Sequence, residues 1–226
     1  EIASCLVGSE MCIRDRHGVL RKFPKGFIFN HGGTQGNVYY ITKGLVFFTF
    51  QDPKDKFRVF GILPPDRVVG DLDAVTQFSI NVFATSARPT ECLVVPGRVY
   101  RALEADPELM KLYAINAVAK EETHMEGMMA VFTLPAEKRL IALASSVINS
   151  YYPLKPDGWN PMPLQLTTFE IADITSSNRS TVSTIINQWV DKGLAKRDGS
   201  WLELHGKLFR DEYDWLNFNS RGSRTP

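Results

Sequence analysis

One row of polar side chains near the C-terminal end of the chain has the chemistry to read the edges of DNA bases. Apolar residues between 182 and 190 recur at intervals of three and four, which predicts a helix with one buried stripe. The other face begins with an arginine, whose guanidinium can pair with both acceptors of guanine. The buried stripe is expected at Val182, Ile185, Ile186, Trp189 and Val190, and the reading face at Arg179, Ser180, Ser183, Thr184 and Asn187.

A second helix and a hairpin are expected on either side of this row. Thr167 followed by Glu170 fits a capping box, which predicts that a short helix begins at Thr168. The Ser-Ser-Asn run at 176–178 then supplies a turn and a new N-cap. Two short helices joined by a tight turn are typical of a helix-turn-helix, and the Asp-Gly pair at 198–199 predicts the hairpin of a wing.

Two cations of the predicted wing, Lys196 and Arg197, are expected to meet phosphates, which position a protein on DNA without carrying sequence information. With Thr168 and the reading face they form the candidate DNA-binding set. The competing interpretation is an ordinary helical hairpin with a solvated face. We favour DNA binding, because such a face usually carries Glu and Lys, whereas this one carries Arg, Ser, Thr and Asn.

The composition places any DNA contact on a local surface of the molecule. The 226 residues carry a formal net charge of +1, with 44% hydrophobic and 23% charged residues, which are ordinary values for a globular protein. No apolar run reaches the roughly 18 residues of a membrane-spanning helix, so no membrane partner is expected. The length is sufficient for two small domains, each with its own core.

The residue types that hold metals or act in catalysis are scattered. The four histidines stand at 17, 31, 124 and 205, so no strand carries the paired ligands of a cupin-type enzyme. Three cysteines are too few for an iron–sulfur cluster, and His31 and His124 are only formally available to a haem. We therefore expect no enzyme activity, no catalytic residues, no metal and no cofactor.

The first 16 residues are excluded from the fold prediction. Residues 5–16 resemble a translated sequencing-adapter read-through, and the residue order of a secretory signal is absent. Cys5 and Cys12 belong to this segment. Cys92 alone supports no disulfide framework, which predicts a reducing, cytoplasmic location.

Residues 17–104 are expected to form a β-domain. Short apolar and aromatic segments alternate there with turn-forming pairs such as Lys43-Gly44 and Asp52-Pro53. Many short strands with regular turns favour a sandwich or barrel.

Residues 105–134 are expected to contain a long helix, at 108–132, that dimerises. Its 25 residues would span about 37 Å, which is longer than one small barrel can cover. The alternative is a helix packed only on its own domain. Apolar side chains with a three-four spacing predict a seam for a second copy at Ile115, Val118, Met125, Met129 and Phe132. Residues 135–210 are expected to form the winged helix-turn-helix domain, and 211–226 a tail. Within this domain, residues 152–163 carry four prolines and are expected to form a loop.

Four motifs in this order resemble the Crp/Fnr family, the cyclic-AMP receptor protein and its relatives. Residues 166–182, LTTFEIADITSSNRSTV, resemble the helix-turn-helix signature of the family. Residues 39–44 and 69–72 resemble its strand-turn and Gly-Glu-Leu motifs, and residues 105–109 stand where its long helix begins. The resemblance covers about residues 19–206. It implies an α+β fold: an N-terminal jelly-roll-like β-barrel of the cyclic-nucleotide-binding type, a long dimerisation helix and a C-terminal winged helix-turn-helix.

The departures from the family concern the effector and the operator. Family members that bind cyclic AMP carry an Arg-Ser pair where an ungapped alignment places Asn81-Val82, so a buried phosphate would lack its charge partner. Asp71 is shorter than the usual Glu, and Ser180 and Thr184 replace a Glu and an Arg of the recognition helix. The effector is therefore expected to be a small molecule other than cyclic AMP, and the effector-binding candidates are Gly70, Asp71, Leu72, Asn81, Val82 and His124.

The function that follows is a homodimeric transcription regulator that binds an inverted repeat in double-stranded DNA and responds to an unidentified small molecule. RNA polymerase is an expected partner. The alternative is a cyclic-nucleotide-type sensor module that acts on a partner protein without binding DNA.

Overall fold

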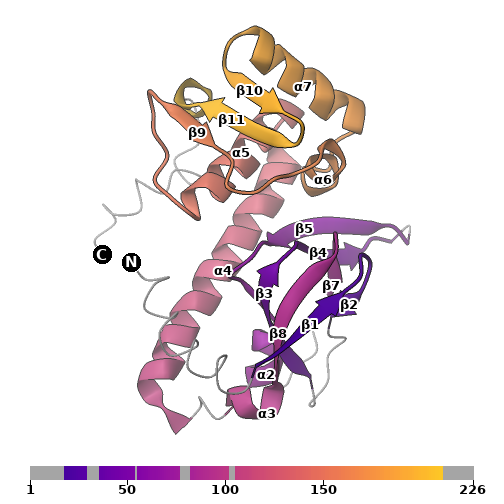
Figure 1. Cartoon of the computed structure of the whole chain (residues 1–226), viewed down its shortest axis with the longest axis vertical. Helices are drawn as coiled ribbons and strands as arrows, with labels where there is room; N and C mark the ends of the chain where they lie inside the picture. The colour runs from indigo at the N-terminus through magenta and orange to yellow at the C-terminus, as the bar shows by residue number, and fades with distance from the viewer. Residues whose placement is uncertain (1–17, 30–35, 54, 77–81, 102–104, 211–226) are drawn as a thin grey trace. The chain divides into compact units, whose positions relative to one another are not determined.

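The computed structural model describes residues 18–29, 36–53, 55–76, 82–101 and 105–210, which form two compact units (Figure 1). Residues 1–124 belong to the first unit and 125–226 to the second. This division falls inside the long helix α4 (Pro107–Thr133). The predicted leader, the predicted tail, Asn81 and His31 lie outside the described residues.

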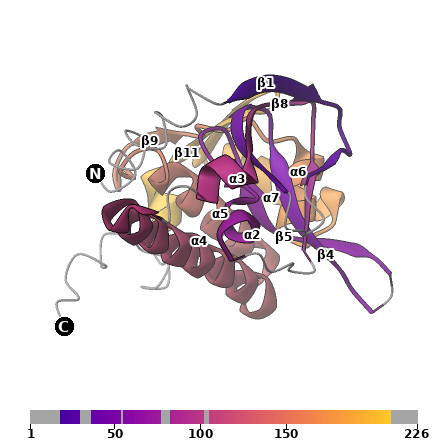
Figure 2. The ribbon, with the colours of Figure 1, turned by 90° about the horizontal axis from the view of Figure 1, so that it is seen from below.

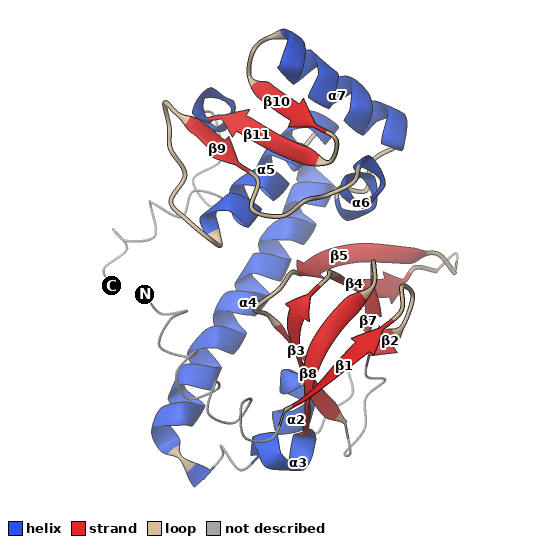
Figure 3. Cartoon of the chain, in the orientation of Figure 1, coloured by secondary structure: helices blue, strands red, loops and turns tan. Residues whose placement is uncertain are grey.

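The first unit contains two antiparallel four-stranded sheets (Figure 3). Short strands form both, as the sequence predicts. The first has the order β1 (Val19–Phe23), β8 (Thr90–Pro96), β3 (Asn37–Lys43), β6 (Val68–Val69), and the second has the order β2 (Ile28–Phe29), β7 (Phe83–Ser86), β4 (Val46–Gln51), β5 (Phe57–Leu63).

One apolar core joins the two sheets. Phe29, Tyr39, Val46 and Val94 come from four different strands and belong to the same buried cluster. Such burial of alternate side chains from both sheets is what makes a β-sandwich stable. Cys92 lies in this core, where burial raises the pKa of its thiol to about 12.

Helices cover the other face of the first sheet. The helices α2 (Asp71–Thr76) and α3 (Gly97–Tyr100) lie beside each other, as Figure 2 shows, and both contact strand β3. Tyr113 of α4 packs with Val38, Tyr40 and Val95 from β3 and β8. These contacts fix the N-terminal part of α4 to the β-sheets.

The long helix has the extent that the sequence predicts, with one more residue at each end. The five apolar residues of its expected seam are all exposed, among them Phe132 at 80%. The first unit and this helix agree with the α+β fold class expected from the sequence.

The second unit is built from helices and a small sheet. Its helices are α5 (Ala136–Asn149), α6 (Thr168–Ile174), α7 (Arg179–Asp191) and the 3-10 helix η2 (Gly206–Phe209). The sheet has the order β10 (Ala195–Asp198), β11 (Trp201–His205), β9 (Trp159–Pro161). Leu140, Ile171, Ile186 and Leu204 come from four of these elements and are buried.

Strand β9 corrects the sequence prediction, which treats residues 152–163 as a loop because they carry four prolines. The prolines leave a three-residue edge strand, and Pro161 stands at its end, where a missing N–H is tolerated. The fully buried amide of Asn160 fixes this segment: its oxygen accepts from Lys155 N at 2.7 Å, and its nitrogen donates to the carbonyl oxygens of Lys155, Gly158 and Leu204.

Candidate nucleic-acid interface and effector site

The first helix of the candidate DNA-binding set begins with the predicted capping box. Glu170 N donates to Thr167 Oγ1 at 3.2 Å, and Thr167 N donates to Glu170 Oε2 at 2.8 Å. These two bonds satisfy donors that a helix start leaves without partners. They confirm that α6 begins at Thr168.

The turn between α6 and α7 is held by a residue that sequence reasoning missed. Ser176 takes a left-handed conformation with φ of 50°, and Ser177 N donates to Ala172 O at 2.9 Å. The guanidinium of Arg139, from α5, donates to the carbonyl oxygens of Thr175 and Ser176 at 3.2 and 3.3 Å. The predicted N-cap, Asn178, has the N-cap position, but its side chain makes no capping hydrogen bond.

Helix α7 separates its two faces largely as predicted. Val182, Ile185, Ile186 and Trp189 are buried, and Trp189 Nε1 donates to Glu137 Oε1 at 2.8 Å. The prediction is wrong for Val190, which is 40% exposed. It directly follows the buried Trp189 and falls at the edge of the buried stripe, about 100° around the helix from Trp189. On the opposite face Ser183 is half-buried, while exposed positions are held by Arg179, Ser180, Thr184 and Asn187.

Arg179 lies over an aromatic ring. Its guanidinium carbon is 4.2 Å from the centroid of the Phe169 ring, and Phe169 itself is 59% exposed. This geometry is a cation–π contact. Sequence reasoning missed Phe169, because a single apolar residue in the first turn of a short helix is most simply assigned to the core.

The wing brings Arg197 to the start of α6. Arg197 Nη2 donates to Thr168 Oγ1 at 3.2 Å, and its Nε donates to Gly199 O at 3.0 Å. The hairpin turns through Gly199, which has a φ of 58°. Two arginines of the candidate set therefore contact neighbouring residues of α6: Arg197 contacts Thr168, and Arg179 contacts Phe169.

Lys196 is held apart from this group. Its ammonium lies 2.7 Å from Glu203 Oε2 and 3.8 Å from the centroid of the Trp159 ring. Successive side chains of a strand point to opposite faces, so Lys196 and Arg197 cannot share one surface of the hairpin. Lys196 is therefore less available to a phosphate than Arg197, because Lys196 already has a carboxylate partner.

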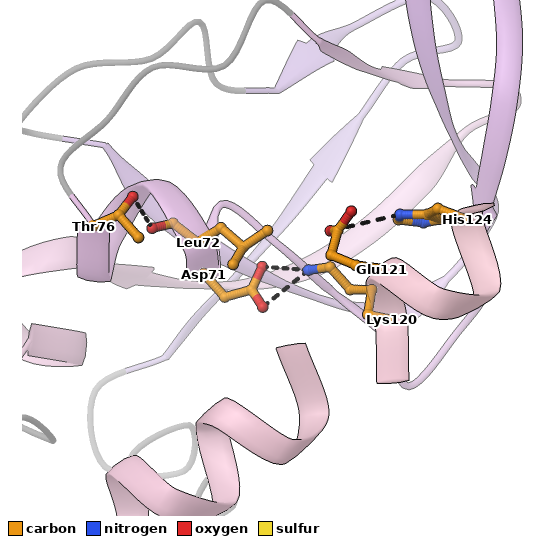
Figure 4. Close-up of polar contacts among 6 residues, drawn as sticks. All are labelled: Asp71, Leu72, Thr76, Lys120, Glu121 and His124. Carbon is orange, nitrogen blue, oxygen red and sulfur yellow. Dashed lines mark hydrogen bonds and ion pairs between the residues drawn. The ribbon is translucent and has the colours of Figure 1, made fainter. Parts of the chain in front are cut away.

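Three of the candidate effector residues, Asp71, Leu72 and His124, lie at or near a buried ion pair in the first unit (Figure 4). Asp71 is 4% exposed, and its two carboxylate oxygens accept from Lys120 Nζ at 2.8 and 3.0 Å. Burial and the negative charge of Asp71 raise the pKa of the neighbouring Asp73, and Lys120 opposes that shift. Sequence reasoning missed Lys120, because a lysine on a long helix is usually solvated.

His124 stands one turn further along α4 and is 7% exposed. Phe48 and Phe60 meet its ring edge-on, with centroids at 5.3 and 5.7 Å. A Cβ on Gly61 would lie only 2.8 Å from His124 Cδ2, so glycine is needed for this close approach. Burial lowers the pKa of His124 from its usual 6.5, and the Glu121 carboxylate, 3.7 Å away, opposes the shift.

The other candidate effector residues take backbone and packing roles. Gly70 has a φ of 83° and its carbonyl accepts from Ala74 N, which shapes the start of α2. Leu72 packs on the cluster that contains Tyr113, and Val82 is half-buried. In the described parts of the chain, no three His, Cys, Asp or Glu side chains are placed to hold a metal.

The chain matches solved structures but no known sequence family. No protein-family model and no curated protein matches the chain. Of the helices in the described ranges, none has the length and apolarity to cross a membrane.

The fold is similar to solved transcription regulators along most of the chain. FixK2 from Bradyrhizobium japonicum has 16% identity and a TM-score of 0.66, over 85% of this chain and 94% of its own. CLP, a c-di-GMP responsive global regulator from Xanthomonas campestris, has 16% identity and a TM-score of 0.62, over 88% of this chain and 100% of its own. A CRP/FNR family transcriptional regulator from Thermus thermophilus has 21% identity and a TM-score of 0.56, over 82% of this chain and 93% of its own. CLP and the Thermus thermophilus protein are described as regulators, and the chain has the fold of CRP/FNR transcription regulators.

Proposed function

We propose that the chain is a cytoplasmic, sequence-specific DNA-binding transcription regulator. The observation that carries this proposal is the exposed group at the start of α6 and α7, where Arg179 stacks on Phe169 and Arg197 bonds to Thr168. Neither guanidinium has a carboxylate partner within the described part of the chain. Neither charge is therefore compensated by a carboxylate, which favours an anionic partner, and phosphates and guanine edges are the acceptors that arginine fits best.

The proposed regulator is a homodimer that binds an inverted repeat. The exposed apolar residues of α4 supply a seam for a second copy, since Val118, Met125 and Phe132 are all more than half exposed. A two-fold dimer presents two recognition helices to successive major grooves. Light scattering at micromolar concentration should therefore show twice the chain mass of 25.5 kDa, and a single-chain mass would contradict the dimer. RNA polymerase is the proposed downstream partner.

The β-domain is proposed to sense a small molecule other than cyclic AMP. The carboxylate of Asp71, the residue matched to the family's ribose-binding Glu, is already occupied by Lys120. A ribose hydroxyl could bond to Asp71 only by competing with a charged partner. Calorimetric titration should detect no binding of cyclic AMP or cyclic GMP, and a micromolar dissociation constant for either would contradict this part of the proposal.

The DNA-binding proposal is tested with a library of random duplexes. Wild-type protein should bind library DNA and slow its migration in a gel-shift assay. The duplexes recovered from the shifted band should be enriched in one inverted repeat. The matched variant is Arg179→Glu/Arg197→Glu, which reverses two exposed charges and should fold like the wild type. It should retain no library DNA at the same salt concentration. Equal retention by both proteins, or no enriched repeat with the wild type, would refute DNA reading by this surface.

A further inference from the structure

Two consecutive residues of α6 each hold one arginine from another element. The hydroxyl of Thr168 accepts from Arg197 of the wing, and the ring of Phe169 lies under Arg179 of α7. Arg197 also donates to Gly199 O, so two bonds orient it. For Arg179, the Phe169 ring is the one contact that orients the guanidinium among the described residues.

The exposure of Phe169 is unexplained by folding. Its neighbours Ile171 and Ala172 are buried in the core of the second unit, whereas Phe169 stays 59% exposed. An exposed phenylalanine contributes little to the apolar area removed from water. Its face is instead used by a cation, and an arginine plane stacked on a ring keeps its edge donors free for a further partner.

We propose that Phe169 is a positioning residue for Arg179 and thereby determines how strongly the chain selects guanine. This inference rests on the proposed DNA-binding function. An exposed arginine without a support samples many rotamers, and a cation–π contact at an exposed site enriches the stacked rotamer by about two- to fivefold. Pairing with both guanine O6 and N7 requires one orientation of the guanidinium plane, so the ring prepares the arginine for that pair before DNA arrives.

The Thr168 hydrogen bond and the Phe169 ring should affect different properties of DNA binding. Loss of the Thr168 bond loosens Arg197, a wing cation, and should weaken binding to all sequences alike. Loss of the Phe169 ring loosens the proposed base-reading arginine and should weaken discrimination at guanine more than overall affinity. The pair Thr168→Val and Phe169→Leu therefore compares two neighbouring positions of one helix turn.

The experiment measures equilibrium binding to the duplex that wild-type protein selects, with each guanine replaced in turn by 7-deazaguanine, which lacks the N7 acceptor. Wild type should lose about tenfold in affinity at one guanine per half-site. Phe169→Leu, which stays apolar but has no ring face, should lose threefold or less there. Phe169→Tyr keeps the ring and should restore the wild-type penalty, while Thr168→Val should lower affinity for every duplex and keep the penalty.

Controls separate positioning from folding. Thermal unfolding should show Phe169→Leu as stable as wild type, and Tyr151→Ala, an exposed aromatic on neither α6 nor α7, should leave the guanine penalty unchanged. An undiminished penalty in Phe169→Leu overturns this inference and leaves DNA binding intact. Failure of the wild type to select any duplex overturns the proposed function itself, so the two failures are distinct.

Discussion

Lys120 in the first unit and Arg179 in the second are two cations held in opposite ways. Lys120 is largely buried and forms two bonds of 2.8 and 3.0 Å with the Asp71 carboxylate. Arg179 is exposed and rests on the neutral ring of Phe169. The charge of Lys120 is compensated by a carboxylate inside the fold, whereas Arg179 is oriented by a neutral ring that leaves its charge uncompensated.

This difference separates a structural cation from the cation that we propose for DNA recognition. In a buried ion pair, the attraction between the two charges offsets the cost of removing them from water. Such a pair holds together the two elements that carry it, but its charges are already compensated and attract a ligand only weakly. A stacked guanidinium keeps its donors free, and its exposed position allows an anionic partner to approach. In this molecule the contact partner, rather than the residue type, determines which of the two cations has its charge uncompensated.

The largest expected effect is the loss of one member of the buried pair. Lys120→Met leaves the Asp71 carboxylate buried without its charge partner, which should lower the free energy of unfolding by about 3 kcal/mol. Lys120→Met/Asp71→Leu removes both charges and should recover most of that loss. Urea denaturation followed by circular dichroism measures both variants.

Lys111→Met is the matched control, because Lys111 is an exposed lysine of the same helix. It should stay within about 0.5 kcal/mol of the wild type. If Lys120→Met were equally mild, Lys120 would be a solvated lysine and the contrast with Arg179 would disappear.

The next effect is a pH dependence of stability that arises from His124. Burial lowers the folded-state pKa of His124 below the 6.5 of the unfolded chain, so the unfolded state binds more protons as the pH falls through that range. The contribution of His124 to the free energy of unfolding is therefore complete above about pH 6.5 and is lost as the pH falls. The free energy of unfolding should change by at most about 1.4 kcal/mol per pH unit from this cause. Urea denaturation of wild type and His124→Gln between about pH 7.5 and 5.5 should show the weaker slope in the variant. Parallel profiles would mean that His124 titrates as freely in the folded protein as in the unfolded chain.

The smallest effect compares the two wing cations. Arg197→Ala should weaken binding to every duplex and reduce the slope of log affinity against log salt by about one for each subunit. Lys196→Ala should change the slope less, because Lys196 is already paired with Glu203. Fluorescence anisotropy in a salt series measures both slopes. A larger change for Lys196→Ala would show that DNA displaces Glu203 and that both wing cations meet phosphate.

Local patterns were the most predictable parts of the fold. The Thr167–Glu170 capping box, the buried stripe of α7 up to Trp189 and the extent of α4 all follow from spacing within one element. Such patterns depend on the 3.6-residue period and on donors that lie within one turn. The strands of the first unit follow in the same way from short apolar runs between turn pairs.

The contacts that matter for the site join residues far apart in the chain. Lys120 meets Asp71 across 49 positions, and Arg139 reaches the turn of the helix-turn-helix across 36 and 37. No local period encodes such partners. Strand β9 was missed for a related reason, since its pairing comes from β11 and the buried Asn160 rather than from its own proline-rich sequence.

Selection from random DNA tests most directly the proposal that Arg179 reads a base. Wild type and Arg179→Ala are compared with Arg197→Ala, at one stated salt concentration. Wild type should select an inverted repeat, and Arg179→Ala should lose about 1–3 kcal/mol of discrimination at one base pair per half-site. Arg197→Ala should select the wild-type motif with lower affinity. An unchanged motif with Arg179→Ala would contradict the assignment of α7 as the recognition helix.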